Sequence, residues 1–349
     1  MFGSIGHHTY MKPSCTIVYS VVVLLLAVTG CTRMRLCMTA EQIVAAIRRG
    51  GSFFLGGAAL FYGGRSLCRI AAPVFLLVGA VAAQAAEVKV YAFKAGVLKT
   101  QTQNILKDTR PGTPMEIPVP FLVIRHGREW AAFDTGCNGQ VARDPVGYWG
   151  EALVKAFTPE FKPDQEFREA IKVLGLKPKD FKAAFISHGH LDHAGAIGDF
   201  VGTTVPIYFQ KAELAEIRKM IDAQKPGAAY ILDDFKHLNE LNIRVIEGPL
   251  DFFGDGSVIV FPTPGHTPGH QSLYVRPSAG PAFIYCADAL YALESMEKLI
   301  PPALAWDVGA TMQNINWFRF EQQTGVRIVP SHDPGYWAQR AWAPQELVP

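Results

Sequence analysis

Four side chains that commonly bind metals lie within six consecutive positions of this chain. They are His188, His190, Asp192 and His193. Neutral imidazole and carboxylate groups are ligands that suit zinc and similar divalent cations. Residues 188 and 190 are two apart in an extended loop, so their rings can bind one ion, whereas residues 192 and 193 lie where the chain turns and can reach a second ion. The spacing predicts half of a two-metal centre rather than an ordinary histidine-rich surface loop.

The elements around this cluster indicate how it is positioned. The apolar run 181–186 predicts a buried strand directly before it, and residues 194–197 predict the start of a helix directly after it. Loops that follow strands are where α/β proteins usually keep their chemistry. Three further candidate ligands also follow predicted strands: His266 after 257–261, Asp288 after 282–286, and His332 after 326–331. We therefore expect several strand ends to converge on one site.

Three neighbouring residues also need an interpretation. His270 follows a Pro-Gly pair just as His266 does, and the residues alone leave both as candidate ligands. Cys286 comes two positions before Asp288, and we expect it to be a small buried residue rather than a ligand. Asp134 begins an Asp-Thr-Gly turn, and we expect it to shape that turn near the site rather than to perform chemistry.

The His-x-His-x-Asp-His pattern at 188–193 resembles the signature of the metallo-β-lactamase superfamily. Within that superfamily, the chain resembles the quorum-quenching N-acyl-homoserine lactonases. Four features carry this second resemblance: the Thr-Pro-Gly-His-Thr-Pro-Gly-His-Gln-Ser block that begins at 263, Tyr291 placed three residues after Asp288, the turn at 133–136, and Ser-His-Asp at 331–333. The resemblance covers residues 88 to 340.

The resemblance implies a dinuclear centre of divalent metals, with zinc as the expected metal. One ion is held by His188, His190 and His266. The other is held by Asp192, His193 and His332. Asp288 and a hydroxide bridge the two ions, Tyr291 donates a hydrogen bond in the site, and His270 packs near the ligands. A tyrosine in such a position is otherwise commonly a half-buried core residue.

The implied reaction is the opening of an N-acyl-homoserine lactone by the bridging hydroxide. The metal pair and Tyr291 would stabilise the oxyanion, and Asp192 would carry a proton to the leaving alkoxide. A glyoxalase-II-like thioesterase is the first alternative, but it needs a basic C-terminal extension that the residues after His332 do not suggest. A β-lactamase that binds metal through cysteine is disfavoured by Asp288. A non-catalytic metal-binding module is disfavoured by the complete ligand set.

Composition limits the partners of the chain. Its 349 residues carry a net charge of +2, so no strongly basic surface indicates a nucleic-acid partner. Four of its six cysteines lie before residue 69, which is not the spacing of a disulfide framework. We expect a small-molecule lactone or ester as the substrate, and a homodimer is an open alternative to a monomer.

Residues 1–86 differ from the rest of the chain because they are apolar and nearly free of acidic side chains. Apolar runs at 17–29 and 70–83 are short for a membrane span but suit signal peptides. The second run ends in an Ala-x-Ala pattern, so we expect a signal peptide that ends near Ala85, a true start downstream of Met1, and a periplasmic enzyme. The alternative is membrane association through a retained 1–86. Either way, residues 87–349 form the catalytic domain.

The pattern from residue 88 onward predicts an α/β fold. Strands are expected at 88–93, 121–124, 130–133, 206–209, 243–246 and 258–261, and helices at 164–174 and 211–221. Two sheets packed face to face with helices outside, an αββα sandwich, fit this alternation, and the family resemblance implies the same fold. The segments 223–242 and 299–306 are expected to form either a substrate-pocket wall or a dimer surface.

Overall fold

The structure, a computed structural model, describes residues 86–349. The predicted signal peptide, its cleavage near Ala85 and the alternative membrane anchor therefore lie outside the described residues and stay predictions. Among the helices that the structure does describe, none combines the length and the apolar character that crossing a membrane requires.

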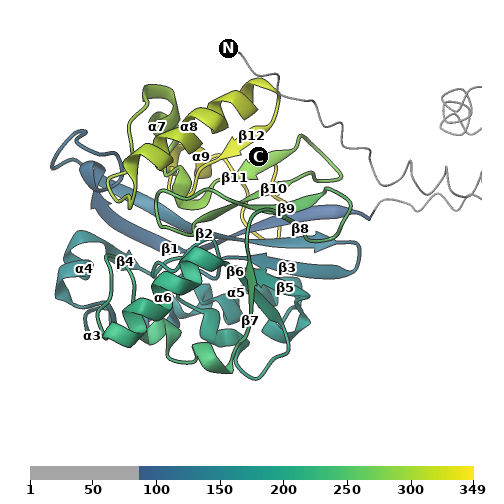
Figure 1. The fold of residues 1–349 in the computed structure, drawn as a ribbon, viewed down its shortest axis with the longest axis horizontal. Coiled ribbons are helices and arrows are strands. Elements are labelled where there is room, and N and C mark those ends of the chain that lie inside the picture. The colour runs from purple at the N-terminus through teal and green to yellow at the C-terminus, as the bar shows by residue number, and fades with distance from the viewer. Residues whose placement is uncertain (1–85) are drawn as a thin grey trace, which may run out of the picture. The chain divides into compact units, whose positions relative to one another are not determined.

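Two β-sheets pack face to face in the middle of the described part of the chain (Figure 1). The first sheet has the strand order β4-β1-β2-β3-β5-β6-β7 and the second has the order β12-β11-β10-β9-β8. The strands of the first sheet are β1 (Val88–Gln101), β2 (Pro114–His126), β3 (Glu129–Phe133), β4 (Thr158–Glu160), β5 (Ala183–Phe185), β6 (Pro206–Gln210) and β7 (Asn242–Ile246). Those of the second sheet are β8 (Leu250–Asp251), β9 (Val258–Pro262), β10 (Gln271–Val275), β11 (Phe283–Tyr285) and β12 (Arg327–Val329).

Helices cover the outer face of each sheet, as Figure 1 shows. The first sheet is covered by α3 (Pro145–Trp149), α4 (Glu151–Ala156), α5 (Phe167–Ala170) and α6 (Lys211–Ala223). The second is covered by α7 (Leu293–Lys298) and α8 (Val308–Gln323), and the short α9 (Pro334–Trp337) follows β12. This is the predicted αββα sandwich.

Three hydrophobic clusters hold the four layers together. The alternation of side chains along β1 places Ala92 in the cluster between the two sheets and Phe93 in the cluster beneath the first layer of helices. Across the inter-sheet cluster, the rings of Phe133 and Tyr285 meet edge to face at 5.7 Å. A third cluster joins the second sheet to α8 through side chains such as Phe318. Burial of both faces of each sheet fixes the strand ends that carry the candidate ligands.

One predicted helix is shorter than expected, and one predicted helix start is wrong. In the stretch 164–174 a helix covers only Phe167–Ala170 and continues as a 3₁₀ turn to Leu174, because Glu166 takes an extended ψ of 143° before it, and Phe167 and Ile171 face the core. No α-helix starts at 194–197, where a 3₁₀ turn begins at Ile197 and ends at Phe200. The hydroxyl of Thr135 bonds the carbonyl of His193 and the N–H of Ala196, so these backbone groups are paired outside any helix.

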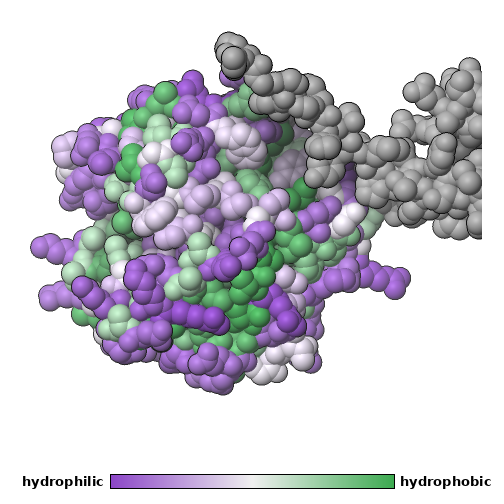
Figure 2. Space-filling view, viewed as in Figure 1, coloured by the Kyte–Doolittle hydropathy of each residue, from purple (hydrophilic) through white to green (hydrophobic). Residues whose placement is uncertain are grey.

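The surface seen in Figure 2 is mostly hydrophilic, with a hydrophobic area over the position of β7 in Figure 1. β7 is an edge strand, and Val245 in it is 50% exposed. The exposed Arg244 and the nearby Lys211–Glu247 ion pair add charge along this edge, which discourages strand pairing with another chain. The homodimer stays a prediction.

Candidate metal centre

The candidate ligands follow strands that end at the same edge of the sandwich. In the first sheet, β5 runs parallel to β3 and leads into the loop 188–193. In the second sheet, β9 and β11 run in one direction because β10 lies antiparallel between them, and β12 is parallel to β11. The loops after β9, β11 and β12 carry the other three candidates, so the fold directs both sheets toward one site.

The structure brings the seven predicted ligands together in two groups. The first group is His188, His190, His266 and Asp288. The second group is Asp192, His193 and His332. Within each group, the candidate ligand atoms all lie within 4.8 Å of one another, and no member of either group is more than 7% exposed. The division matches the one that the family resemblance implies.

The carboxylate of Asp288 faces both groups. Its Oδ1 lies 3.1 Å from Nε2 of His193 and 3.1 Å from Nε2 of His332. Its Oδ2 lies 3.3 Å from Nε2 of His266 and 3.5 Å from Nε2 of His188. One oxygen is therefore directed toward each group, as a bridging ligand requires.

Four of the five candidate histidines are oriented by a partner on Nδ1, which leaves Nε2 toward the centre. These partners are Ser187 Oγ for His188 (3.0 Å), Asp134 Oδ2 for His193 (2.8 Å), the Leu304 carbonyl for His266 (2.8 Å) and the Pro118 carbonyl for His332 (2.8 Å). Histidines that bind metals usually have such a partner on the other ring nitrogen. The fifth, His190, instead directs Nδ1 at Nε2 of His266, 2.9 Å away.

Several buried polar atoms at the candidate metal centre lack a hydrogen-bond partner among the described residues and are suited to bind cations. Nε2 of His188, Nε2 of His193 and Oδ1 of Asp288 are buried, and none has a hydrogen bond of acceptable geometry among the described residues. Buried polar atoms without a partner are rare in folded proteins because leaving them unpaired costs free energy. All three atoms belong to the two ligand groups, so a pair of divalent cations is the partner that this donor set suits.

Electrostatics differ between the two groups. Burial lowers the pKa of His188 and of His190 well below the usual range, which keeps both rings in the neutral form that binds metals. Burial alone would also lower the pKa of His193, but the carboxylates of Asp288 and Asp192 outweigh it and raise that pKa well above its usual value. Cations at the second group therefore compete with protons.

Asp134 does more than shape the turn near the site, which was its predicted role. It does lie in the turn after β3, with a φ of +64° that is uncommon outside glycine. Its carboxylate also accepts bonds from the N–H and the hydroxyl of Ser187, at 2.6 and 2.8 Å, and contacts His193. Asp134 therefore orients a candidate ligand as well as shaping the turn.

The structure separates His266 from His270. His270 is outside both ligand groups, and both of its ring nitrogens are occupied: Nδ1 lies 2.8 Å from the hydroxyl of Thr263, and Nε2 accepts the backbone N–H of Asp288 at 3.1 Å. Cys286 is buried, as expected. Asp288 lies in the 3₁₀ turn Ala287–Ala289, beyond the strand that ends at Tyr285.

A small cavity of about 40 Å³ lies beside the ligands. One side of it is formed by His190, Asp192, Asp288, Tyr291 and His332. The rest is apolar and consists of Leu98, Ile105, Ile117, Phe157, Leu191, Ala229 and Leu304. Ala229 and Leu304 come from the two segments whose role the sequence left open, so both segments contribute to the pocket wall.

Tyr291 lines this cavity and is 6% exposed. Its ring centroid lies 5.4 Å from the ring of His266 and 5.4 Å from the ring of His332, one from each ligand group. Burial raises the pKa of the Tyr291 hydroxyl well above its usual value, so the group keeps its proton. It is therefore available as a hydrogen-bond donor at the edge of the centre.

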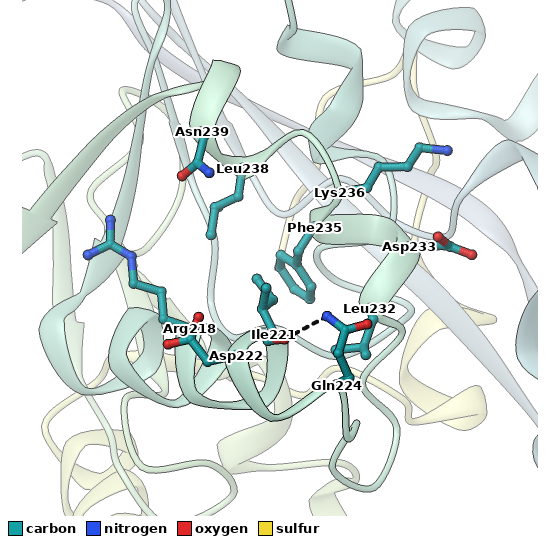
Figure 3. Close-up of a pocket in the computed structure, with 10 residues that line it drawn as sticks. All are labelled: Arg218, Ile221, Asp222, Gln224, Leu232, Asp233, Phe235, Lys236, Leu238 and Asn239. Carbon is teal, nitrogen blue, oxygen red and sulfur yellow. Dashed lines mark hydrogen bonds between the residues drawn. The ribbon is translucent and has the colours of Figure 1, made fainter.

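A larger cavity, of about 360 Å³, lies between the C-terminal half of α6 and the segment 232–239 (Figure 3). Figure 3 shows Ile221, Phe235 and Leu238 turned toward its middle, with charged side chains of both signs, such as Arg218 and Asp222, around them. None of the seven candidate ligands lines it. The smaller cavity, which both ligand groups line, is therefore the candidate active site.

Sequence reasoning missed several groups that orient the ligands. Leu304 and Pro118 act through backbone carbonyls, which leave no trace in residue type. Glu213 in α6 is fully buried and bonds the loops on both sides of the first group. Its spacing of four and seven residues from Ile217 and Met220, on the buried face of α6, is the signal that could have found it.

Comparison with known proteins gives consistent results. A profile of the metallo-beta-lactamase superfamily matches residues 116–332. An N-acyl homoserine lactonase, AttM, of Rhizobium radiobacter is 33% identical over 264 residues, which are 74% of this chain and 98% of the relative. In fold, the chain is similar to an N-acyl homoserine lactone hydrolase solved with N-hexanoyl-L-homoserine at its catalytic metal centre, with a TM-score of 0.66, 24% identity, and coverage of 74% of this chain and 98% of that one. It is also similar in fold to AidC, a dizinc quorum-quenching lactonase, with a TM-score of 0.53, 15% identity, and coverage of 76% and 95%.

Proposed function

This chain is a metal-dependent hydrolase of the metallo-β-lactamase superfamily, and we propose that it opens the lactone ring of N-acyl-homoserine lactones. The observation that carries the proposal is the composition of the small cavity. Both ligand groups and Tyr291 line one side of it, and apolar side chains line the rest. An acyl lactone has the complementary chemistry, because it offers one ester carbonyl for activation and an apolar chain. The activity of curated relatives such as AttM supports the same substrate class.

The proposed cofactor is a pair of zinc ions, one in each ligand group. When bound, two divalent cations would polarise the carbonyl as Lewis acids and would lower the pKa of a water molecule. Tyr291 would donate a hydrogen bond to the oxygen that becomes negatively charged. Asp192 would accept the proton of the attacking water on a carboxylate oxygen and then donate it to the alkoxide that leaves when the ring opens. The apolar wall would exclude water around the acyl chain.

Two other reactions use similar ligands. A β-lactamase of the cysteine-containing type is disfavoured because Asp288 lies between the ligand groups, whereas the sulfur of Cys286 is turned to the carbonyl of Ile284, 3.8 Å away. A glyoxalase-II-like thioesterase remains the closest alternative in chemistry, because it needs the same activation of an acyl carbon.

A panel of three substrates tests the proposal. The purified zinc-loaded protein is assayed with an N-acyl-homoserine lactone, S-lactoylglutathione and a chromogenic cephalosporin. We expect lactone hydrolysis to exceed the other two reactions, and treatment with a chelator to abolish it until zinc is restored. Faster turnover of the thioester or the cephalosporin would contradict the proposal, as would lactone hydrolysis that survives complete metal removal.

Tyr291→Phe tests the oxyanion role. We expect kcat to fall about 100-fold, the usual loss when one oxyanion donor is removed, while metal content stays at two per chain. The Phe variant keeps the ring that packs against His266 and His332, so a loss can be assigned to the hydroxyl. Steady-state kinetics beside metal analysis check this, and wild-type kcat would remove Tyr291 from the mechanism.

A further inference from the structure

Glu213 is a fully buried carboxylate that the proposed reaction does not use. It lies in the first turn of α6 and accepts four hydrogen bonds. The donors are the N–H of Gly189 (2.8 Å) and the hydroxyl of Tyr230 (2.8 Å) on Oε1, and the hydroxyl of Thr267 (2.6 Å) and the N–H of Gly269 (3.1 Å) on Oε2. An ionised carboxylate has about four acceptor positions, so these donors fill its capacity.

Three of the four donors lie next to a histidine of the first ligand group, and the fourth, Gly269, lies in the same loop as His266. Gly189 stands between His188 and His190 in the sequence, and Thr267 directly follows His266. The Tyr230 ring packs edge to face on His190, with 4.6 Å between centroids. One carboxylate therefore joins the loop after β5, the loop after β9 and the segment that carries Tyr230.

The two glycines among the donors make this close approach feasible. A Cβ atom at Gly269 would lie 2.0 Å from the backbone nitrogen of Glu213, and one at Gly189 would lie 2.6 Å from the Tyr230 ring. Real side chains do not tolerate such distances, so a larger residue at either position would push a loop away from α6. The glycines at these two turns therefore leave room for the Glu213 carboxylate between the loops.

The second ligand group has separate supports. Its histidines are held by Asp134 and by the carbonyl of Pro118, and none of the four hydrogen bonds of Glu213 goes to a residue adjacent to Asp192, His193 or His332. We therefore expect a substitution at Glu213 to change metal binding in the first ligand group only.

We propose that Glu213 is a positioning residue that sets the metal affinity of the group formed by His188, His190 and His266, and not that of the second group. The inference rests on the metal centre of the proposed function, but not on the identity of the substrate. Residues that orient metal ligands typically change metal affinity about 10- to 100-fold when they are replaced.

Glu213→Gln is a sharp test because the amide has nearly the same shape. Glutamine offers one acceptor oxygen and one NH₂ group in place of two acceptor oxygens. The backbone N–H groups of Gly189 and Gly269 bond different oxygens of Glu213, and neither can reverse its direction. In either orientation of the amide, one backbone N–H faces an NH₂ group and loses its acceptor. A hydroxyl, in contrast, can rotate to accept a bond.

The experiment measures metal binding on the full-length protein, with no lactone present. Zinc affinities are determined by chelator competition, and cobalt substitution gives the visible absorption of each site. For Glu213→Gln we expect one of the two metals to bind about 10- to 100-fold more weakly and the other to bind as in the wild type. Glu216→Gln is the matched control, since Glu216 lies one turn later in α6 and, among residues 86–349, pairs with the exposed Lys219 alone; we expect wild-type binding at both sites.

Two outcomes would overturn the inference: unchanged affinities in Glu213→Gln, or equal weakening of both metals in a folded variant. If Glu213→Gln does not fold, Thr267→Val replaces it, because that change removes one donor and keeps both backbone bonds. Selective weakening of one metal in Thr267→Val supports the inference, and unchanged binding contradicts it. A negative lactone assay affects neither result, so the two proposals fail separately.

Discussion

Asp288→Asn should lower kcat/KM at least about a thousandfold. Asp288 is the one ligand that faces both groups, with Oδ1 at 3.1 Å from His193 and His332 and Oδ2 at 3.3 Å from His266. Asparagine removes the negative charge and replaces one of these oxygens with an NH₂ group that cannot bind a cation. A bound cation supplies several kcal/mol of stabilisation in the transition state, and about 1.4 kcal/mol corresponds to a tenfold change in rate. Metal analysis should show fewer than two metals per chain.

Asp234→Asn is the matched control for this change. Asp234 is also buried, and burial raises its pKa to about 8, so its carboxyl group is mostly protonated at neutral pH. The amide therefore resembles the native group in charge as well as shape, and it keeps the oxygen that accepts bonds from Tyr148 and Asn138. We expect two metals and activity close to wild type. An Asp288→Asn enzyme with two metals and activity comparable to this control would rule out the bridging role.

Residue type and spacing were enough to predict much of the fold and the candidate ligands, and the family resemblance narrowed these to the seven side chains that the structure brings together. Apolar runs predicted the strands, since a strand buried on both faces needs continuous apolar residues, as in 183–186. His266, Asp288 and His332 were recognisable because each follows such a run. The helix start at 194–197 was wrong because tertiary hydrogen bonds from Thr135 take the backbone groups that a helix would use.

The distinction between His266 and His270 illustrates what sequence does not contain. Both follow Pro-Gly, so residue type does not separate them; the family resemblance assigns the metal to His266, and the contacts agree, since His270 accepts the N–H of Asp288 whereas His266 faces its carboxylate. Glu213 is a second case. Its spacing from the buried Ile217 and Met220 places it on the inner face of α6, but the glycines that admit its carboxylate are far away in the sequence.

The origin of the ligands also relates the fold to the reaction. The loop 188–193 comes from the first sheet, whereas the other three candidates come from the second. Each ligand group therefore contains residues from both sheets. Cations bound to these groups would join the two halves of the sandwich at the edge where the substrate enters the small cavity. Geometry at this edge then depends on how the two sheets pack, for example through the contact of Phe133 with Tyr285.

Asp192→Asn should lower turnover of the lactone by about 100- to 10,000-fold, the usual contribution of a group that transfers a proton in the transition state. Asp192 lines the small cavity, and its Oδ2 lies 3.4 Å from Nε2 of His332 in the second ligand group. Asparagine keeps a neutral oxygen at this position but cannot accept and then release a proton. We expect two metals per chain to remain bound. Metal content is measured beside turnover, so that a loss of proton transfer is distinguished from a loss of metal.

The leaving group distinguishes the two roles of Asp192. A lactone releases an alkoxide, which is strongly basic and needs a proton as the ring opens, whereas a p-nitrophenyl ester releases a phenolate that is stable without one. If Asp192 delivers the proton, Asp192→Asn should impair lactone hydrolysis severely and ester hydrolysis only slightly. Equal losses on both substrates would assign Asp192 to metal binding alone. Unchanged lactone turnover with two bound metals would show that Asp192 has no role in proton transfer.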